Sequence, residues 1–247
     1  SPFRRKLSVF LLFYNVDACG IEAVLLLVFD GGIADTESQY TCFWNKMGKD
    51  YLDLDNFGLT IKGQTLVQIF GKHFDGMVKE QEEIVIQLNA FEQNMSYDYI
   101  PGALEFMQEL KERGIRSAIV TSSNDIKMSN VYAAHPELHD LVDAILTSEH
   151  FSKSKPDPEC FLKGMEVLGG TPEETIVFED SFHGLTAGRA AGAKVIGLAT
   201  TNSAEAIAPL CDLVINDFKS LSINDLHKMP AVTIQQAFCI RGCLSVR

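Results

Sequence analysis

The sequence lacks the features that mark membrane, zinc-binding and nucleic-acid-binding chains. No apolar run reaches the length needed to cross a membrane. The six cysteines contain no CxxC pair, and Cys239 and Cys243 have no matching second pair for a zinc site. Reduced thiols in a cytoplasmic protein are the expected state. Lys and Arg number 21 against 33 Asp and Glu, a net charge of −12 that disfavours nucleic acid as a partner.

The chain also lacks internal repeats and low-complexity tracts. Its 247 residues, 46% hydrophobic, suit one domain or a domain with an insert. Residues 1–20 form an atypical N-terminal segment that imitates a secretory signal, but its apolar stretch is short and Asp17 directly precedes Ala18, so we expect no secretion. Residues 230–247 form a tail that fits no further element.

Short apolar runs alternate with helical patterns through most of the chain. We predict strands within residues 21–29, 115–123, 141–149, 175–181, 194–201 and 211–218, and helices within 101–114 (with Pro101 in its first turn), 124–136, 160–170 and 182–193. Such alternation predicts an α/β fold with a Rossmann-like, doubly wound parallel sheet, formed by residues 21–37 and 99–229. Between them, apolar residues recur at helical spacing, which predicts an all-helical insert over residues 38–98.

Polar residues follow the predicted strands, at the edge of a parallel sheet where ligands bind. They are Asp30, Thr121 with Ser122, the lysine loop HFSKSKPDPE, and Glu179 with Asp180. Carboxylates are hard oxygen ligands for Mg²⁺, although Asp180 could instead cap a helix. Lys155, in a proline-stiffened loop, could hold a fixed positive charge or be solvated. Together these residues indicate a metal and phosphate site.

Four motifs in this order resemble the haloacid dehalogenase superfamily: the strand ending in Asp30 with Asp-Thr-Glu at 35–37, then IVTSS, SKPDPE and FEDSFHGLTAGRAAG. The resemblance covers about residues 21–225. Within the superfamily, the chain is more similar to the phosphatase and β-phosphoglucomutase-like branch, whose members carry a helical cap. The predicted insert would form this cap. It implies a Mg²⁺-dependent phosphatase that acts on a small phosphorylated metabolite, such as a sugar phosphate, through an aspartyl-phosphate.

The same resemblance implies the roles of single residues. Asp30, Thr121 and Lys155 would be catalytic, and Ser122 and Lys62 would contact the substrate. Mg²⁺ would be held by Asp30, Glu179 and Asp180. The match to SKPDPE selects Lys155 over its neighbour Lys153.

One carboxylate of the family's motif Asp-x-Asp-Gly-x-x-x-Asp-Thr is missing. In the ungapped register, Asp30 is the second acid and Val28 occupies the position of the nucleophile. In the other register Asp30 is the nucleophile and Gly32 replaces the second acid. We prefer the first register because it keeps Gly31 and the spacing to Asp35. Valine cannot attack phosphorus, so either the protein binds phosphate esters or a partner without turnover, or the N-terminal sequence as given contains an error.

Two further positions separate phosphatase from phosphohexomutase. The mutases carry a histidine where this chain has Tyr40, and an arginine where it has Leu66. Tyrosine is a poorer proton shuttle and leucine cannot bind a second phosphate. We therefore expect a phosphatase rather than a mutase, acting as a monomer on a small metabolite and independent of membranes.

Overall fold

Six parallel strands form one sheet in the computed structural model, which describes residues 23–62 and 64–226. The order across the sheet is β3-β2-β1-β4-β5-β6. Their bounds are β1 Val24–Leu27, β2 Ser117–Val120, β3 Ala144–Leu146, β4 Thr175–Glu179, β5 Lys194–Leu198 and β6 Leu213–Ile215. Each predicted strand is present and shorter than its apolar run, which confirms the α/β fold with a parallel sheet. The N-terminal segment 1–20 and the tail 230–247 lie outside the described residues.

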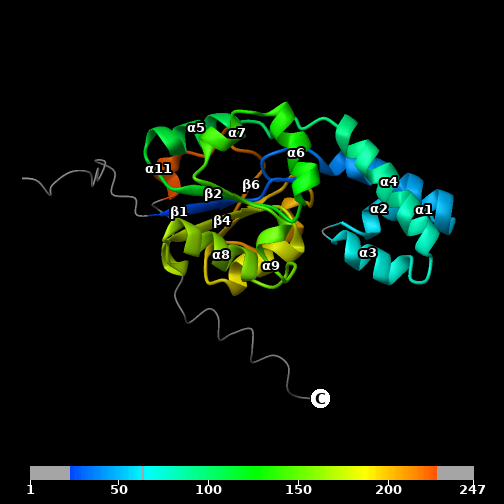
Figure 1. Ribbon diagram of the computed structural model, residues 1–247. Coiled ribbons are helices and arrows are strands. Elements are labelled where there is room, and N and C mark those ends of the chain that lie inside the picture. Colours follow the sequence, from blue (N-terminus) through cyan, green and yellow to red (C-terminus); the bar gives the residue numbers. More distant parts are fainter. Residues whose placement is uncertain (1–22, 63, 227–247) are drawn as a thin grey trace, which may run out of the picture.

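Helices cover both faces of the sheet (Figure 1). One face carries α5 Ala103–Glu112, α6 Asp125–Ala134, α7 Leu138–Leu141 and α11 Ile223–Leu226, and the other carries α8 Glu159–Leu168 and α9 Phe182–Ala190. A further helix, α10 Ala204–Ile207, packs beside β5 and β6. Short 3₁₀ turns lie at Ser148–His150, Pro172–Glu174 and Ala208–Leu210. The sheet is therefore wound on both sides, as the alternating pattern predicts.

The central strand β1 is apolar throughout because both of its faces are covered. Leu25 and Leu27 belong to the cluster under α5, α6 and α7, whereas Val24 and Leu26 belong to the cluster under α8 and α9. All four side chains are fully buried. This alternation along the strand places Val28 on the α8 side at the carboxyl end of the sheet.

Residues between β1 and α5 form the helical insert, with α1 Glu37–Leu52, α2 Phe57–Thr60, α3 Leu66–His73 and α4 Val78–Asn94. It has its own core, which includes Trp44, Phe57 and Phe74. The insert lies beside the carboxyl ends of the strands (Figure 1). In this position the insert could act as a lid over the carboxyl ends of the strands.

The chain enters and leaves the insert through two linkers that are paired with each other. Ala34 and Tyr99 form an antiparallel bridge, and the Ile100 amide donates to the Ile33 carbonyl at 2.8 Å. The Gln39 side chain accepts from the Ser96 amide and donates to the Ser96 carbonyl. The two linkers thus form one short two-stranded connection between the sheet and the insert.

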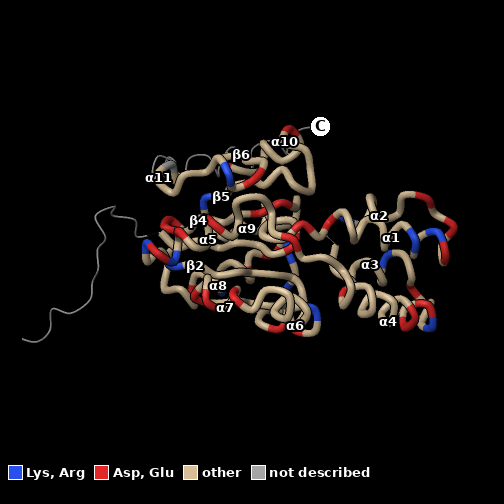
Figure 2. Tube along the Cα trace, turned by 90° about the horizontal axis from the view of Figure 1, so that it is seen from above, with Lys and Arg blue, Asp and Glu red and all other residues tan. Residues whose placement is uncertain are grey.

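The helix predicted to begin at Pro101 begins instead at Ala103. Gly102 has φ +83°, a left-handed conformation that glycine adopts without strain, so the chain turns there before α5 starts. Among the described residues, no helix is long and apolar enough to cross a membrane. Acidic positions are spread over both the sheet domain and the insert (Figure 2).

Candidate functional site

A cavity of about 580 Å³ lies between the carboxyl ends of the strands and the insert. Its size suits a small metabolite. The predicted site residues all line it: Asp30, Lys62, Thr121, Ser122, Lys155, Glu179 and Asp180. They come from both the sheet and the insert, so the fold gathers residues that are far apart in the sequence.

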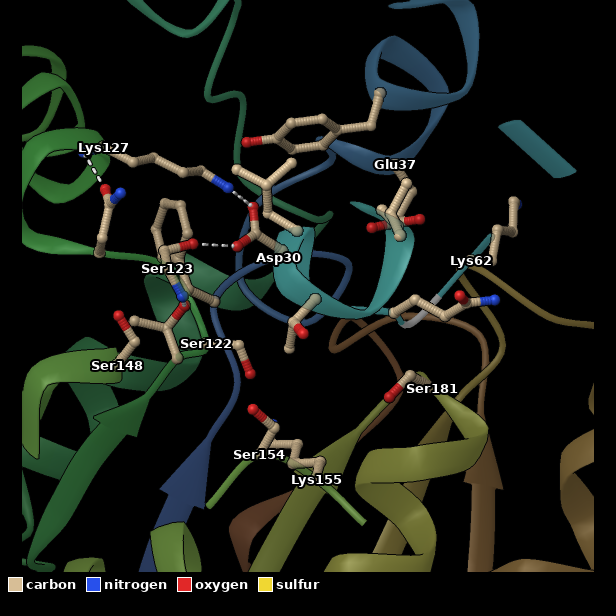
Figure 3. Close-up of a pocket in the computed structure, with 18 of the residues that line it drawn as sticks. Asp30, Glu37, Lys62, Ser122, Ser123, Lys127, Ser148, Ser154, Lys155 and Ser181 are labelled. Carbon is tan, nitrogen blue, oxygen red and sulfur yellow. Dashed lines mark hydrogen bonds and ion pairs between the residues drawn. The ribbon is translucent and has the colours of Figure 1, made fainter. Parts of the chain in front are cut away.

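Asp30 is held on both of its carboxylate oxygens. Oδ1 accepts from the Thr36 hydroxyl at 2.8 Å and from the Lys127 ammonium at 2.5 Å, and Oδ2 accepts from the Ser123 hydroxyl at 2.7 Å (Figure 3). Burial alone would raise the pKa of Asp30, but the Lys127 charge and these hydrogen bonds hold it below its ordinary value. Asp30 is therefore an ionised, oriented carboxylate whose oxygens are already engaged.

Val28 lies at the end of β1 and lines the same cavity. Its amide donates to the Phe178 carbonyl at 3.2 Å, so it continues the β1–β4 pairing by one residue. A Cβ added at Gly32 would lie 2.4 Å from the Val28 carbonyl oxygen, which leaves no room for an acidic side chain there. The geometry supports the ungapped register, with Val28 in the position where the family's pattern has its nucleophile.

Lys155 and Glu179 form a buried ion pair beneath the cavity. The Lys155 ammonium lies 2.6 Å from Glu179 Oε1, and the two side chains are 10% and 2% exposed. Burial opposes the ammonium charge, but the charges of Glu179, Cys160 and Asp180, with the hydrogen bond to Glu179, together raise the pKa of Lys155. Glu179 Oε2 accepts from the amides of Asp180 and Ser181. Glu179 therefore fixes the lysine and the start of α9.

Of the three strand-end acids Asp30, Glu179 and Asp180, Asp180 is the one that is not paired with a lysine. Its Oδ2 accepts from the Thr201 hydroxyl, and it packs so closely on Gly31 that a Cβ there would lie 2.1 Å from this oxygen. Burial and the neighbouring Glu179 raise its pKa well above the ordinary range. A bound cation would offset both the burial of this carboxylate and its repulsion by Glu179. Asp180 is therefore chemically suited to be a metal ligand.

The acids do not form a full metal site, however. In the described part of the chain, no three His, Cys, Asp or Glu side chains are grouped so that they could hold a metal ion. Asp30 is turned to Lys127, Glu179 is turned to Lys155, and residue 28 is valine. The donors present fit Mg²⁺ in their chemistry but are too few for tight binding.

The remaining predicted residues surround the cavity. Thr121 is buried at the end of β2, and its hydroxyl accepts from the Ser123 amide at 3.0 Å. Ser122 between them is exposed. Lys62, from the insert, reaches the sheet domain and donates to the Thr201 carbonyl at 3.3 Å. This contact joins the insert to the loop after β5, on the side of the cavity opposite Lys127 (Figure 3).

Sequence reasoning missed Lys127 and Glu92, and it considered Tyr40 only as the position where the mutases carry a histidine. Lys127 on α6 is 4% exposed, and its ammonium lies 4.5 Å from the centre of the Tyr40 ring. The Tyr40 hydroxyl donates to Glu92 Oε1 at 2.7 Å. Burial and the nearby Asp30 and Glu92 charges raise the pKa of Tyr40 well above its ordinary value. A signal for Lys127 existed, because it shares a helix face with the apolar Val131 four residues later.

Polar and charged groups at the strand ends, under a helical insert, thus form the candidate site of this α/β fold. Comparison with known proteins gives the family. The model of the haloacid dehalogenase-like hydrolases matches residues 26–198. The chain belongs to the haloacid dehalogenase-like hydrolase family, and the hydrolase class predicted from the sequence is confirmed at that level.

Relatives of known function include several phosphatases. The chain is 34% identical over 158 residues to the protein SUPPRESSOR OF QUENCHING 1, chloroplastic, of Arabidopsis thaliana, covering 63% of the chain and 15% of that protein. It is 26% identical to the bifunctional riboflavin kinase/FMN phosphatase of the same plant, covering 80% and 52%. It is 25% identical to glycerol-1-phosphate phosphohydrolase 2 of Saccharomyces cerevisiae (strain ATCC 204508 / S288c), covering 78% and 82%. The alignments thus span about half or less of the first two relatives.

Solved structures share the fold. A haloacid dehalogenase-type hydrolase of family IA, variant 3, from Entamoeba histolytica HM-1:IMSS superposes with a TM-score of 0.71 at 23% identity, covering 84% of this chain and 98% of that one. β-Phosphoglucomutase from Clostridium difficile gives 0.69 at 22% identity, covering 90% and 100%. Both cover the sheet and the insert together, so the whole architecture is shared.

Proposed function

We propose that the cavity binds a small phosphate monoester, such as a sugar phosphate, and that the chain is built as a phosphatase. The observation that carries this proposal is the placement of Lys155 and Thr121 on one cavity at the strand ends. A fixed ammonium and a buried hydroxyl are suitable partners for phosphoryl oxygens. Relatives named as FMN phosphatase and glycerol-1-phosphate phosphohydrolase support the same ligand class.

Each residue has a part in this proposal. Lys155 attracts the phosphoryl group, and Thr121 with the exposed Ser122 orients it. Asp30 is the acid/base group, positioned by Ser123 and Lys127. Mg²⁺, when bound, would screen the phosphoryl charge next to Asp180. Lys62 closes the far side of the cavity from the insert.

Residue 28 sets the rate in this proposal. Covalent phosphatase chemistry needs an attacking carboxylate, and a valine side chain has no lone pair to donate. Loss of a catalytic nucleophile costs several orders of magnitude in rate. The chain as given should therefore bind its ligand and turn it over barely above background.

A second candidate is a phosphate-ligand binder or interaction protein without turnover. Val28 favours it, and so does the engagement of both Asp30 oxygens by neighbouring side chains. A phosphohexomutase is the weakest candidate. The Tyr40 hydroxyl is committed to Glu92, and its raised pKa makes it a poor proton carrier near neutral pH. Leu66 supplies no charge for a second phosphate.

The net charge of −12 supports a small-molecule ligand rather than nucleic acid. We also propose a monomer that acts in the cytoplasm, independently of membranes. The ligand class has a direct test. Calorimetry with inorganic phosphate in Mg²⁺ buffer should show binding to the unmodified chain, and Lys155→Met should lose it while the exposed Lys153→Met keeps it. Unchanged binding in Lys155→Met would contradict the proposed site.

A further inference from the structure

The wall that the insert contributes to the cavity differs from its floor. The floor carries the charges of Asp30, Lys127, Lys155, Glu179 and Asp180. Across from it, helices α1, α3 and α4 supply a wall whose apolar members are Trp44, Leu66, Val67, Ile69, Val85 and Leu88. The insert also contributes three charged residues to the lining, Glu37, Lys62 and Glu92. A phosphoryl group bound at the floor would direct the organic part of its ester toward this wall.

Each lysine that lines the cavity has a partner, but the partner of Lys62 is an uncharged carbonyl. Lys127 is paired with Asp30 and Lys155 with Glu179, and the Lys62 ammonium donates to the Thr201 carbonyl. The residues that line the cavity, all within the described part of the chain, include no arginine. A second phosphate at the wall would lose hydration and would meet two acids of the insert, Glu37 and Glu92, against its single lysine, Lys62, which is unfavourable.

Besides Tyr40, four uncharged polar side chains interrupt the wall, and three of these four bond within the insert. Thr41 donates to the Glu37 carbonyl, Gln64 donates to the Thr60 carbonyl, and Thr65 caps α3. The fourth, Asn89 on α4, has no side-chain hydrogen bond to another described residue. Its amide offers two donors and an acceptor. Asn89 is therefore available to a ligand.

We propose that the insert selects monophosphates whose organic part is partly apolar and carries no second anionic group, with one hydroxyl or carbonyl group bound by Asn89. Leu66, Ile69 and Leu88 contact the apolar portion. Val67 is 81% exposed at the rim, so the apolar wall continues to the solvent and accommodates a long organic part. This inference rests on the proposed function, because it takes the phosphoryl group to be bound at the floor.

Four probes separate these contributions: inorganic phosphate, phenyl phosphate, 4-(hydroxymethyl)phenyl phosphate and 1,4-phenylene bisphosphate. Binding to the full chain is measured by calorimetry in Mg²⁺ buffer, where Val28 keeps the esters intact. Phenyl phosphate should bind about tenfold more tightly than inorganic phosphate because its ring meets the apolar wall. The hydroxymethyl group should add a further gain of about fivefold. The bisphosphate should bind about tenfold more weakly than phenyl phosphate.

Variants test the assignment of residues. Asn89→Leu should remove the gain from the hydroxymethyl group and leave phenyl phosphate unchanged. Asn94→Leu, on the same helix and outside the cavity, should leave all four affinities unchanged. Leu66→Arg should reverse the order and favour the bisphosphate, since it adds a cation to the wall.

The outcomes distinguish this inference from the proposed function. If inorganic phosphate and the three esters all fail to bind, the proposed function is wrong and this inference falls with it. If phosphate binds but phenyl phosphate binds no more tightly, or if the bisphosphate binds best, the inference alone is overturned. Retention of the hydroxymethyl gain in Asn89→Leu would likewise overturn the role of Asn89.

Discussion

The Lys155 ammonium and Glu179 Oε1 lie 2.6 Å apart in a pair almost wholly withdrawn from solvent. Removal of one member leaves the other charge buried without a partner. We expect Lys155→Met to lower the free energy of unfolding by about 3–5 kcal/mol. Chemical denaturation checks this. The double variant Lys155→Met/Glu179→Gln should recover part of the loss, and the exposed Lys153→Met is the control. A stable single variant would show that Glu179 finds another partner.

Position 28 decides turnover. The unmodified chain should hydrolyse an aryl phosphate barely above background, and Val28→Asp should raise the rate by about two orders of magnitude or more, because it restores an attacking carboxylate. Val28→Asn, similar in shape but a poor nucleophile, is the matched control, and thermal melts check that both fold. Gly32→Asp should give no gain, since its Cβ would lie 2.4 Å from the Val28 carbonyl oxygen.

Two results would contradict the register. Robust turnover by the unmodified chain, with a phosphoryl adduct trapped on Asp30, would make Asp30 the nucleophile. Robust turnover without such an adduct would point to a difference between the given sequence and the protein that was measured, and mass spectrometry of the peptides over residues 20–40 would resolve it.

Glu92 should make stability depend on pH. Burial raises its pKa above the ordinary 4.5, despite the hydrogen bond from Tyr40. Above pH 4.5 the folded state therefore holds a proton that the unfolded state releases, so stability falls as pH rises toward the folded-state pKa. Glu92→Gln keeps the Tyr40 bond and removes this loss. Its stability relative to the unmodified chain should increase from about pH 4.5 upward, measured by denaturation at several pH values.

Glu82→Gln, at an exposed position of the same helix, is the control for that series. If Glu92→Gln and Glu82→Gln show the same pH dependence, the burial of Glu92 has no effect on stability.

Asp180 should dominate the binding of Mg²⁺. It is the one strand-end acid that is not paired with a lysine, and its raised pKa reflects a charge that a cation would stabilise. Calorimetry should show weak Mg²⁺ binding to the unmodified chain and none to Asp180→Ala. The exposed Asp140→Ala should bind as the unmodified chain does. Equal affinity in Asp180→Ala would place the metal elsewhere.

The insert should move when ligand binds. It joins the sheet through paired linkers and contacts the loop after β5 through Lys62. Closure of such a lid excludes water from phosphoryl transfer. Solution scattering should therefore show a smaller radius of gyration with phosphate than without, and Lys62→Ala should weaken the change. Identical curves would argue for a fixed insert.

The sequence predicted the sheet because each strand lies in a short apolar run, and the central strands β1, β2, β4 and β5 are almost wholly buried. It missed α7, α10 and α11 because helices of four residues are too short to show a period. It also placed Pro101 inside α5, whereas the turn at Gly102 precedes that helix.

Site residues that belong to local sequence motifs could be predicted. Contacts between residues far apart in the sequence could not. The strand ends place Asp30, Thr121 and Asp180 on one cavity, as expected. The lysine that pairs with Asp30, Lys127, is 97 residues away on α6. From the sequence alone, a lysine on this helix would be interpreted as a solvated side chain. No local pattern shows that two acids will turn toward two lysines, so the shortage of metal ligands emerged only in three dimensions.

The paired linkers have a consequence for how such a chain can diversify. The bridge between Ala34 and Tyr99 brings the two ends of the insert together. The insert is therefore attached to the sheet domain at a single place, like the loop of a hairpin. Helices of another length or surface could be exchanged at this point without altering the order or register of the strands. The residues that select the ligand can thus change in evolution while those that handle phosphate stay fixed.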